Sequence, residues 1–271
     1  MTDEASSSEL IDPQGRIIDY LRISVTDRCD LRCVYCMSEK MSFLPRAQLL
    51  TLEEIHRLAR IFVEMGVGRI RITGGEPLVR RNVVSLIQRI GELPGLDKLC
   101  LTTNATQLPR HAKQLKAAGV TRINISLDSL RPDRFRRITR NGDLNRVLRG
   151  IDAAIEAGFP HIKINAVILK GRNEDEVIDL ARFALQRDLD ISYIEEMPLG
   201  QIDDHDRAES FCSSDEILEQ LQQTFRLQPC PGEGGGPSRY HAVDGYRARI
   251  GFISPHSHNF CASCNRVRLT A

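Results

Sequence analysis

The sequence of 271 residues lacks the features that place a protein at a membrane or on a nucleic acid. No stretch approaches the roughly 18 consecutive apolar residues that cross a bilayer. The N-terminus has no basic segment followed by an apolar run, so we expect no secretory signal and a cytoplasmic location. The net charge is only +1, which argues against binding of DNA, RNA or a membrane by the field of the whole molecule. Any anionic ligand must therefore be held by a local group of Arg and Lys residues.

Disulfide bonds are not expected either, although the chain has eight cysteines. A reducing cytoplasm keeps thiols reduced, so clustered cysteines indicate metal sites instead. Three cysteines lie close together near the start, and Cys261 and Cys264 form a pair near the end. The scattered Cys100, Cys212 and Cys230 are interpreted as small buried or partly buried side chains.

What the chain does have is a repeated unit. Gly66, Gly119 and Gly158 each follow an amphipathic, helix-like stretch and take the left-handed position that ends a helix. Each glycine leads into a run that alternates with period two, as a strand does. Alternating runs of this kind lie at 20–25, 69–73, 98–102, 122–126, 161–165 and 190–195. Six strand-then-helix units predict an α/β fold with a parallel sheet and right-handed crossovers.

The alternation within these strands indicates the type of sheet. One face carries isoleucines and the other carries polar side chains, whereas strands buried on both faces read as continuous apolar runs. We therefore predict a partial (β/α)6 barrel with a polar lumen. Residues 1–14 are expected to be a flexible tail and 15–198 the barrel. Residues 199–271 are expected to form a C-terminal α+β extension at the barrel mouth. The sequence ends inside an expected strand, so we expect a truncated form of a longer parent.

The first cysteine cluster lies in the loop after the first expected strand. Cys29, Cys33 and Cys36 can hold three irons of a [4Fe–4S] cluster and leave the fourth iron open. A structural zinc site would need four ligands and usually paired C-x2-C units. The spacing favours an open iron–sulfur cluster, while a zinc or redox site with a remote fourth ligand remains the alternative.

Two motifs together resemble the radical S-adenosylmethionine (SAM) superfamily. They are the C-x3-C-x2-C segment at 29–36 with an aromatic residue before its last cysteine, and the Gly-Gly-Glu-Pro segment at 74–77. The resemblance implies that SAM binds the open iron and is cleaved by one electron to methionine and a 5′-deoxyadenosyl radical. It also implies the barrel of the radical SAM type. By the same resemblance, the residues that contact SAM are Tyr35, Gly75, Ser126 and Met197.

A closer resemblance covers the chain from about Tyr20 to its end. Segments 22–29, 71–78, 102–104, 124–128 and 260–269 resemble, in this order, the GTP 3′,8-cyclase family of molybdenum cofactor biosynthesis. This implies a lyase that abstracts the 3′ hydrogen of GTP and joins C3′ to C8, giving 3′,8-cyclo-7,8-dihydro-GTP. It also implies a second [4Fe–4S] cluster that binds guanine and has Cys261 and Cys264 among its ligands.

The same resemblance suggests the partners. They are GTP, a reduced flavodoxin-type or other electron donor, and the next enzyme of the pathway, cyclic pyranopterin monophosphate synthase. The oligomeric state is left open, a homodimer included, and so is the identity of the electron donor.

The expected lumen suits a triphosphate, because guanidinium forks match phosphate oxygens. Arg22, Arg71 and Lys163 lie on the polar face of their strands, and Arg266 and Arg268 lie two apart on the last one. The resemblance assigns these five to GTP, together with Thr102 and Val267. Charges at strand starts, such as Arg69 and Arg122, are interpreted as ordinary solvated groups.

The match with the family fails at the second cluster. The family has a third cysteine further along, but only seven residues follow Cys264 and none is cysteine. The second cluster is therefore doubtful in this chain, and a zinc site of His256, His258 and the two cysteines is an alternative. Two other functions are alternatives. One is a radical SAM peptide-modifying enzyme with an auxiliary cluster, and the other is a non-catalytic iron–sulfur or zinc scaffold.

Overall fold

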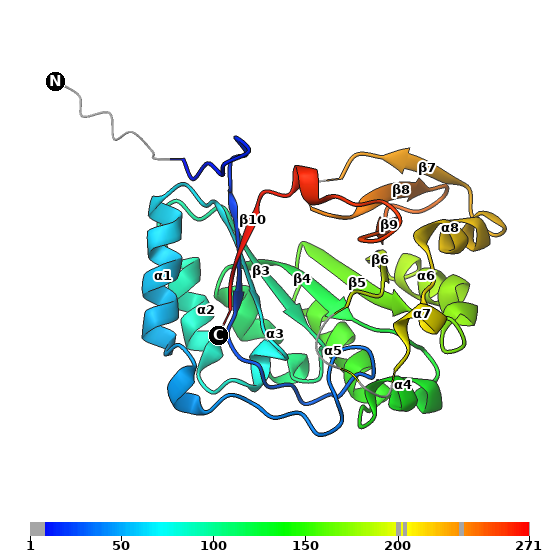
Figure 1. The fold of residues 1–271 in the computed structure, drawn as a ribbon, viewed down its shortest axis with the longest axis horizontal. Helices are drawn as coiled ribbons and strands as arrows, with labels where there is room; N and C mark the ends of the chain where they lie inside the picture. Colours follow the sequence, from blue (N-terminus) through cyan, green and yellow to red (C-terminus); the bar gives the residue numbers. More distant parts are fainter. Residues whose placement is uncertain (1–8, 199–201, 203–204, 233–235, 271) are drawn as a thin grey trace.

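The computed structural model describes residues 9–198, 202, 205–232 and 236–270. A single ten-stranded sheet forms the centre of this part of the chain, in the order β10-β1-β2-β3-β4-β5-β6-β9-β8-β7 (Figure 1). The six predicted strands are present and each pairs in parallel with the next: β1 (Tyr20–Ser24), β2 (Arg69–Thr73), β3 (Lys98–Thr103), β4 (Val120–Ser126), β5 (His161–Ile168) and β6 (Asp190–Glu195).

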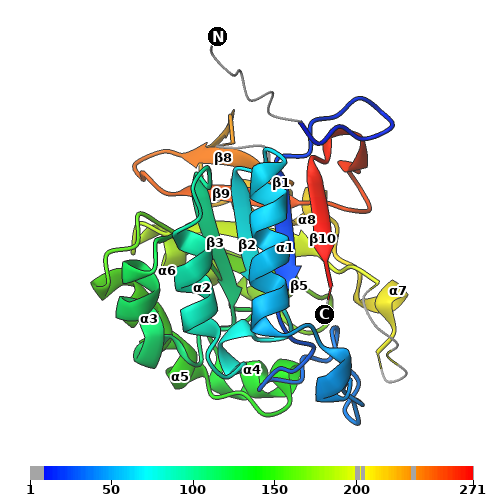
Figure 2. The same cartoon turned by 90° about the vertical axis from the view of Figure 1, so that its left-hand side faces the viewer.

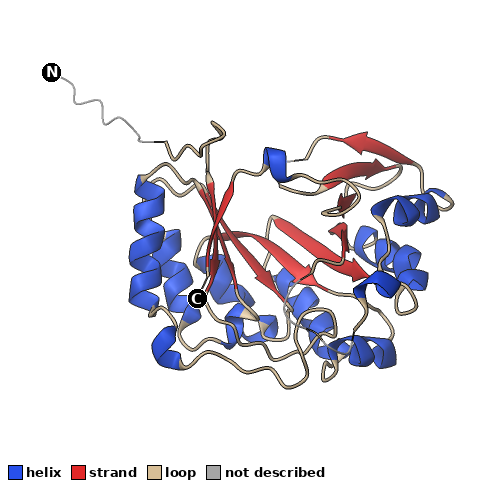
Figure 3. Ribbon diagram, viewed as in Figure 1, coloured by secondary structure: helices blue, strands red, loops and turns tan. Residues whose placement is uncertain are grey.

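Helices cover the outer face of these strands (Figures 2 and 3). Gly66, Gly119 and Gly158 have φ of +90°, +85° and +70°, so all three take the predicted left-handed conformation where the chain leaves a helix for a strand. The helices are α1 (Leu52–Glu64), α2 (Val83–Gly91), α3 (Leu108–Ala117), α4 (Pro132–Thr139), α5 (Leu144–Glu156) and α6 (Val177–Leu185). Short 3-10 helices lie at η1 (Arg46–Gln48), η2 (Pro77–Val79) and η3 (Glu174–Glu176).

The apolar face of the strands forms the core. Its side chains are fully buried against the helices, and they include Ile23, Ile72, Leu101, Ile125 and Ile164. Each such burial contributes on the order of 2 kcal/mol, so the sheet has one strongly preferred face toward the helices. The polar residues that alternate with this set must then face the hollow side of the curved sheet. The predicted α/β partial barrel with a polar lumen is thus confirmed.

The C-terminal extension continues the barrel sheet at both of its edges. Strand β9 (Arg249–Ile253) pairs in parallel with β6, and β8 (Arg239–Val243) and β7 (Leu227–Cys230) add antiparallel strands beyond it. At the other edge β10 (Arg266–Leu269) pairs in parallel with β1. The extension also contains α7 (Arg207–Ser210), α8 (Ser214–Gln222) and η4 (Cys261–Ser263).

The β10–β1 pairing places the two cysteine groups at opposite ends of the barrel. Arg266, the first residue of β10, pairs with Tyr20, the first residue of β1, so Cys264 lies near the N-terminal end of the strands. Cys29 follows the C-terminal end of β1. Because a strand rises about 3.3 Å per residue, the length of β1 alone separates the groups by about 13 Å.

The N-terminal segment packs near the second cysteine group. Residues 9–14, which we assigned to a flexible tail, include Ile11, which bridges to Ile17. Arg16 donates a hydrogen bond to the carbonyl oxygen of Cys261 at 2.7 Å. The rest of the predicted tail, 1–8, lies outside the described residues. In the described chain, no helix is both long and apolar enough to cross a membrane.

Candidate active site

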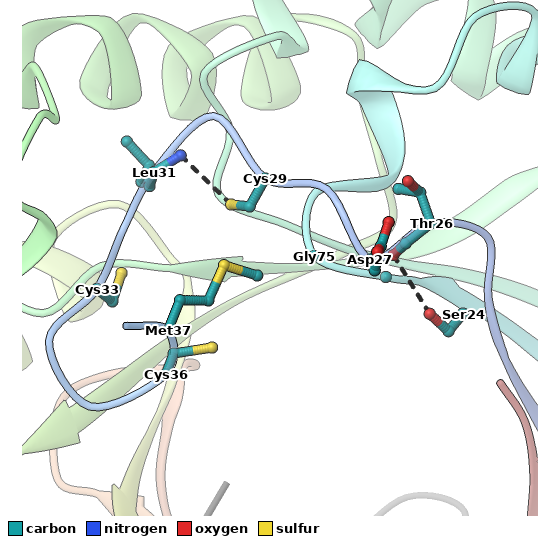
Figure 4. Close-up of a pocket in the computed structure, with 10 residues that line it drawn as sticks. Ser24, Thr26, Asp27, Cys29, Leu31, Cys33, Cys36, Met37 and Gly75 are labelled. Atoms are coloured by element: carbon teal, nitrogen blue, oxygen red, sulfur yellow. Dashed lines mark hydrogen bonds between the residues drawn. The ribbon is translucent and has the colours of Figure 1, made fainter. Parts of the chain in front are cut away.

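A cavity of about 260 Å³ lies where β1 and β2 end (Figure 4). It brings together the three cysteines of the first group and the glycine pair of segment 74–77, as expected from their positions after neighbouring parallel strands. Its lining consists of Ser24, Thr26, Asp27, Cys29, Leu31, Cys33, Cys36, Met37, Gly74 and Gly75.

Hydrogen bonds to neighbouring loops hold the cysteine loop in place. The Asp30 carboxylate accepts hydrogen bonds from the Asn104 side-chain amide at 2.7 Å and the Thr106 hydroxyl at 2.6 Å. On the other side, the Arg140 guanidinium donates to the carbonyl oxygen of Met37 at 2.8 Å. The loop is therefore fixed from the ends of β3 and α4, and its thiols need little ordering to bind a ligand.

Glu76 connects the glycine pair to β3. Its buried carboxylate accepts hydrogen bonds from the backbone N–H of Leu78 at 2.9 Å and of Asn104 at 2.6 Å, and from the Thr103 hydroxyl at 2.9 Å. Burial raises the pKa of Glu76 to about 7. With its oxygens occupied in this way, Glu76 acts as a structural link, and the backbone of Gly74 and Gly75 faces the cavity.

The glycine pair is required by the close approach of the cysteine loop. A Cβ on Gly75 would lie 2.5 Å from the carbonyl oxygen of Arg28, and one on Gly74 would lie 2.5 Å from that of Thr26. Both distances are too short for any side chain without movement of the loop backbone.

The donor set fits an iron–sulfur cluster. Burial raises the pKa of Cys29 to about 11 and that of Cys33 well above its usual range, so these thiols need a bound cation to become thiolates. The three thiols lie on one loop and line one cavity, as the three protein ligands of a cubane cluster with an open iron would.

The residues expected to contact SAM lie at the same end of the barrel. Ser126 is the last residue of β4, and Met197 follows β6. The Tyr35 hydroxyl donates a hydrogen bond to the Asp128 carboxylate at 2.7 Å, just beyond β4. These three border the strand ends, but of the four expected residues only Gly75 lines the cysteine cavity.

Cations crowd the lumen further down the strands. Arg22 is the register partner of both Arg71 and Arg268, so three guanidinium groups follow one another across β2, β1 and β10. Burial lowers the pKa of Arg22 to about 10, and the charges of Arg268 and Arg71 act in the same direction. A bound anion would relieve this repulsion. Arg266 lies on the same face, whereas the Val267 side chain packs against the core on the opposite face.

Hydroxyl groups orient the deepest cations. The Arg71 guanidinium donates to the Thr102 hydroxyl at 3.2 Å and to the Tyr20 hydroxyl. The Lys163 ammonium donates to the Tyr240 hydroxyl at 3.2 Å.

The charges at strand starts divide into two cases. Arg69 forms an ion pair with Asp19. Arg122, which we interpreted as a solvated charge, lies close enough to Lys163 for its charge to lower the pKa of that lysine.

Two lumen amides have unused hydrogen-bonding capacity. Within the described chain, the side-chain oxygens of Asn124 and Asn165 are buried and have no hydrogen-bond partner. Asn124 is the register partner of both Thr102 and Lys163. An unpartnered buried oxygen costs free energy, so this wall of the lumen suits a ligand that carries hydroxyl or N–H groups.

The second cysteine pair lies on one turn, with the backbone N–H of Cys264 donating to the carbonyl oxygen of Cys261 at 3.2 Å. Both histidines of the zinc alternative have other partners in this structure. His256 Nε2 lies 3.0 Å from the carbonyl oxygen of Glu196, and His258 Nε2 lies 2.9 Å from the Asp215 carboxylate. All eight cysteines are free thiols, and Cys100 and Cys212 are buried as predicted.

Several residues that shape the site were not found from the sequence. Asn104 and Asp128 were in recognisable segments, but their roles depend on loops that meet only in the fold. Tyr20 and Tyr240 carried no pattern that separates an orienting hydroxyl from an ordinary aromatic side chain.

Comparison with protein families agrees with this geometry. The model of the Radical SAM superfamily matches residues 23–184, and that of Molybdenum Cofactor Synthesis C matches residues 189–271. The fold and the cysteine cavity thus define the chain as a radical SAM enzyme.

Individual relatives of the chain identify a narrower family within this superfamily. GTP 3′,8-cyclase of Pseudomonas entomophila is 59% identical over 268 residues, and GTP 3′,8-cyclase 1 of Pseudomonas aeruginosa is 61% identical over 264. The matches cover 98% and 97% of this chain and 80% of each relative. The chain belongs to the GTP 3′,8-cyclase family.

Solved structures share the fold at low sequence identity. SuiB of Streptococcus suis bound to S-adenosylmethionine has a TM-score of 0.67 and 17% identity, covering 93% of this chain and 58% of SuiB. SuiB bound to precursor peptide SuiA has a TM-score of 0.63 and 21% identity, covering 78% of this chain and 47% of SuiB. At these identities the likeness extends to the fold alone.

Proposed function

We propose that this chain converts GTP to 3′,8-cyclo-7,8-dihydro-GTP by removal of the 3′ hydrogen and formation of the C3′–C8 bond. Membership of the radical SAM superfamily implies a [4Fe–4S] cluster and SAM, which together supply the hydrogen-abstracting radical. One observation carries the proposal: a single lumen has the cysteine cavity at one end and a group of buried cations further along the same strands.

At the cysteine end, Cys29, Cys33 and Cys36 would hold the first cluster. The backbone of Gly75 would approach the methionyl group of SAM, and Tyr35, Ser126 and Met197 would complete the SAM site. The support for this assignment is their common position at or just after the C-terminal ends of β1, β2, β4 and β6. Bonds from Asp30 and Arg140 keep the loop in one conformation, so the thiols would meet the irons already arranged.

In the lumen, the cations would hold the triphosphate of GTP. Guanidinium groups bind phosphate oxygens with two parallel hydrogen bonds, and their mutual repulsion favours a multiply charged anion. Val267 would contribute its backbone, because its side chain packs against the core. The residues proposed to bind GTP are Arg22, Arg71, Thr102, Lys163, Arg266, Val267 and Arg268.

At the far end, Cys261 and Cys264 would supply two ligands of a second [4Fe–4S] cluster that binds guanine. In this organisation the barrel, 15–198, holds SAM, while the extension, 199–271, closes the substrate end. A reduced flavodoxin-type donor would supply electrons. The product would pass to cyclic pyranopterin monophosphate synthase.

The test uses GTP deuterated at the 3′ position. The protein is reconstituted anaerobically with iron and sulfide, incubated with dithionite, SAM and the labelled GTP, and the 5′-deoxyadenosine is analysed by mass spectrometry. We expect deuterium in the deoxyadenosine. A Cys33→Ala variant should give none, and a Cys212→Ala variant, altered at a buried cysteine away from the cavity, should behave as the wild type. Unlabelled deoxyadenosine, formed equally without GTP, would reject GTP as the substrate.

A further inference from the structure

The Lys163 ammonium is buried in the lumen with a tyrosine as partner. Lys163 is 9% exposed, and its Nζ donates to the Tyr240 hydroxyl at 3.2 Å and lies 5.6 Å from the centre of the Tyr240 ring. Burial lowers the pKa of Lys163, whereas Tyr240 acts in the opposite direction. Tyr240 therefore stabilises a charge that burial disfavours.

Tyr240 reaches Lys163 from a distant strand. It lies on β8, and two strands, β9 and β6, separate β8 from β5 in the sheet. Its register partner on β9 is Gly251. A Cβ at Gly251 would lie 3.0 Å from the Tyr240 ring and 2.3 Å from the Ser238 hydroxyl. The missing side chain thus leaves the space through which the ring extends into the lumen.

A cation also holds the Tyr240 ring in place. The Arg249 guanidinium lies 4.6 Å from the centre of the Tyr240 ring, and it forms a 2.8 Å ion pair with Asp190. Tyr240 itself is only 7% exposed. With the ring packed on Arg249, the hydroxyl has a defined place, and the ammonium that donates to it is fixed as well.

We propose that Tyr240 is a positioning residue for substrate binding, which holds the Lys163 ammonium in the orientation that binds the anionic part of GTP. The inference rests on the proposed function, because GTP supplies the anion. An ammonium has three N–H donors, so the bond to Tyr240 leaves donors for phosphate oxygens. The flexible lysine stem is then ordered before GTP arrives, and binding does not have to order it.

The test compares Tyr240→Phe with Tyr246→Phe. The first variant keeps the ring and removes only the hydroxyl, and the second does the same at a tyrosine that is 39% exposed. Affinity for GTP is measured by calorimetry on the anaerobically reconstituted enzyme without reductant. We expect roughly tenfold weaker binding for Tyr240→Phe, the effect of one hydrogen bond to a charged group, and wild-type affinity for Tyr246→Phe. In turnover, the KM for GTP should rise while kcat stays the same.

A double-mutant cycle separates positioning from a general loss of structure. In a Lys163→Ala background, Tyr240→Phe should weaken GTP binding no further, because Tyr240 acts through Lys163. An equal loss in both backgrounds would overturn the inference. The inference would also be overturned if Tyr240→Phe bound GTP as tightly as the wild type while Lys163→Ala bound it weakly. A wild-type protein that binds no GTP would instead reject the proposed function itself.

The pH dependence gives an independent measurement. Tyr240 from β8 favours the charged form of Lys163, whereas Arg71 from β2 and Arg122 from β4 disfavour it. Asp190 from β6 is the register partner of Lys163. In Tyr240→Phe, GTP affinity should therefore begin to fall at a lower pH than in the wild type. Identical pH profiles would contradict the role given to Tyr240.

Discussion

At the scale of single residues, the cysteine cavity depends on two positions that bind no iron. Glu76 connects the ends of β2 and β3 through its carboxylate, and Gly75 lets the cysteine loop pass close to its backbone. Both roles depend on how the cysteine loop packs against the loops after β2 and β3. Substitutions at Glu76 and Gly75 should therefore affect the site without removing a cysteine ligand of the cluster.

Glu76 should make stability depend on pH. Burial raises its pKa from 4.5 to about 7, so the folded state binds a proton more tightly than the unfolded state. Its contribution to the free energy of unfolding is fully present below about pH 4.5 and is lost as the pH rises through 7. The loss amounts to roughly 3 kcal/mol at most. Urea unfolding of the wild type and of Glu76→Gln, measured from pH 5 to 8, should show a steeper decline in the wild type. Equal slopes would contradict this role of burial.

Gly75→Ala should damage the cavity. The new Cβ meets the Arg28 carbonyl oxygen, so the cysteine loop must move away. We expect at least tenfold slower SAM cleavage, since small displacements of reacting groups are costly. Gly236→Ala is the control, because a Cβ there meets nothing within 4 Å. If both variants cleave SAM at the wild-type rate, the close approach is not required.

At the scale of elements, the cysteine loop relies on helix α4 and the loop that follows β3. The backbone N–H of Val34 donates to Ile138 of α4 at 2.9 Å, and Arg140 donates to Met37. The loop has no regular structure of its own, so these contacts determine its shape.

Arg140→Ala should therefore loosen the first cluster. We expect faster loss of iron to a chelator in the reconstituted protein, by roughly a factor of five to ten for the loss of hydrogen bonds from a charged group. Arg137→Ala is the matched control, because Arg137 is an exposed arginine in the last turn of α4, just before Arg140. Equal rates of iron loss, followed by the visible absorbance of the cluster, would show that α4 does not hold the loop.

The sequence predicted elements better than it predicted contacts between them. Period-two alternation depends only on which face of a strand is buried, so runs such as 69–73 were recognisable directly. The cysteine motif was equally local. The pairing of β10 with β1 and the reach of Tyr240 across Gly251 depend on the curvature of the whole sheet, which no short segment encodes.

At the scale of the whole molecule, the two cysteine groups lie at opposite ends of one barrel. Cys29→Ala should abolish SAM cleavage. Cys261→Ala should retain SAM cleavage while it lowers the yield of cyclised GTP, because it alters the far end alone. Deoxyadenosine and cyclised nucleotide are quantified by liquid chromatography, with Cys230→Ala on β7 as control. Loss of SAM cleavage in Cys261→Ala would contradict the separation of the two ends.

The pairing of β1 with β10 also has a consequence for synthesis. As the chain leaves the ribosome, β1 emerges early and β10 emerges much later. One edge of β1 thus stays without its native partner until β10 has been made. Contacts such as that of Arg16 with Cys261 span 245 residues, and such long-range contacts slow folding. An unpaired edge can meanwhile associate with another chain, so newly made protein should be most prone to aggregation in the interval before β10 joins the sheet.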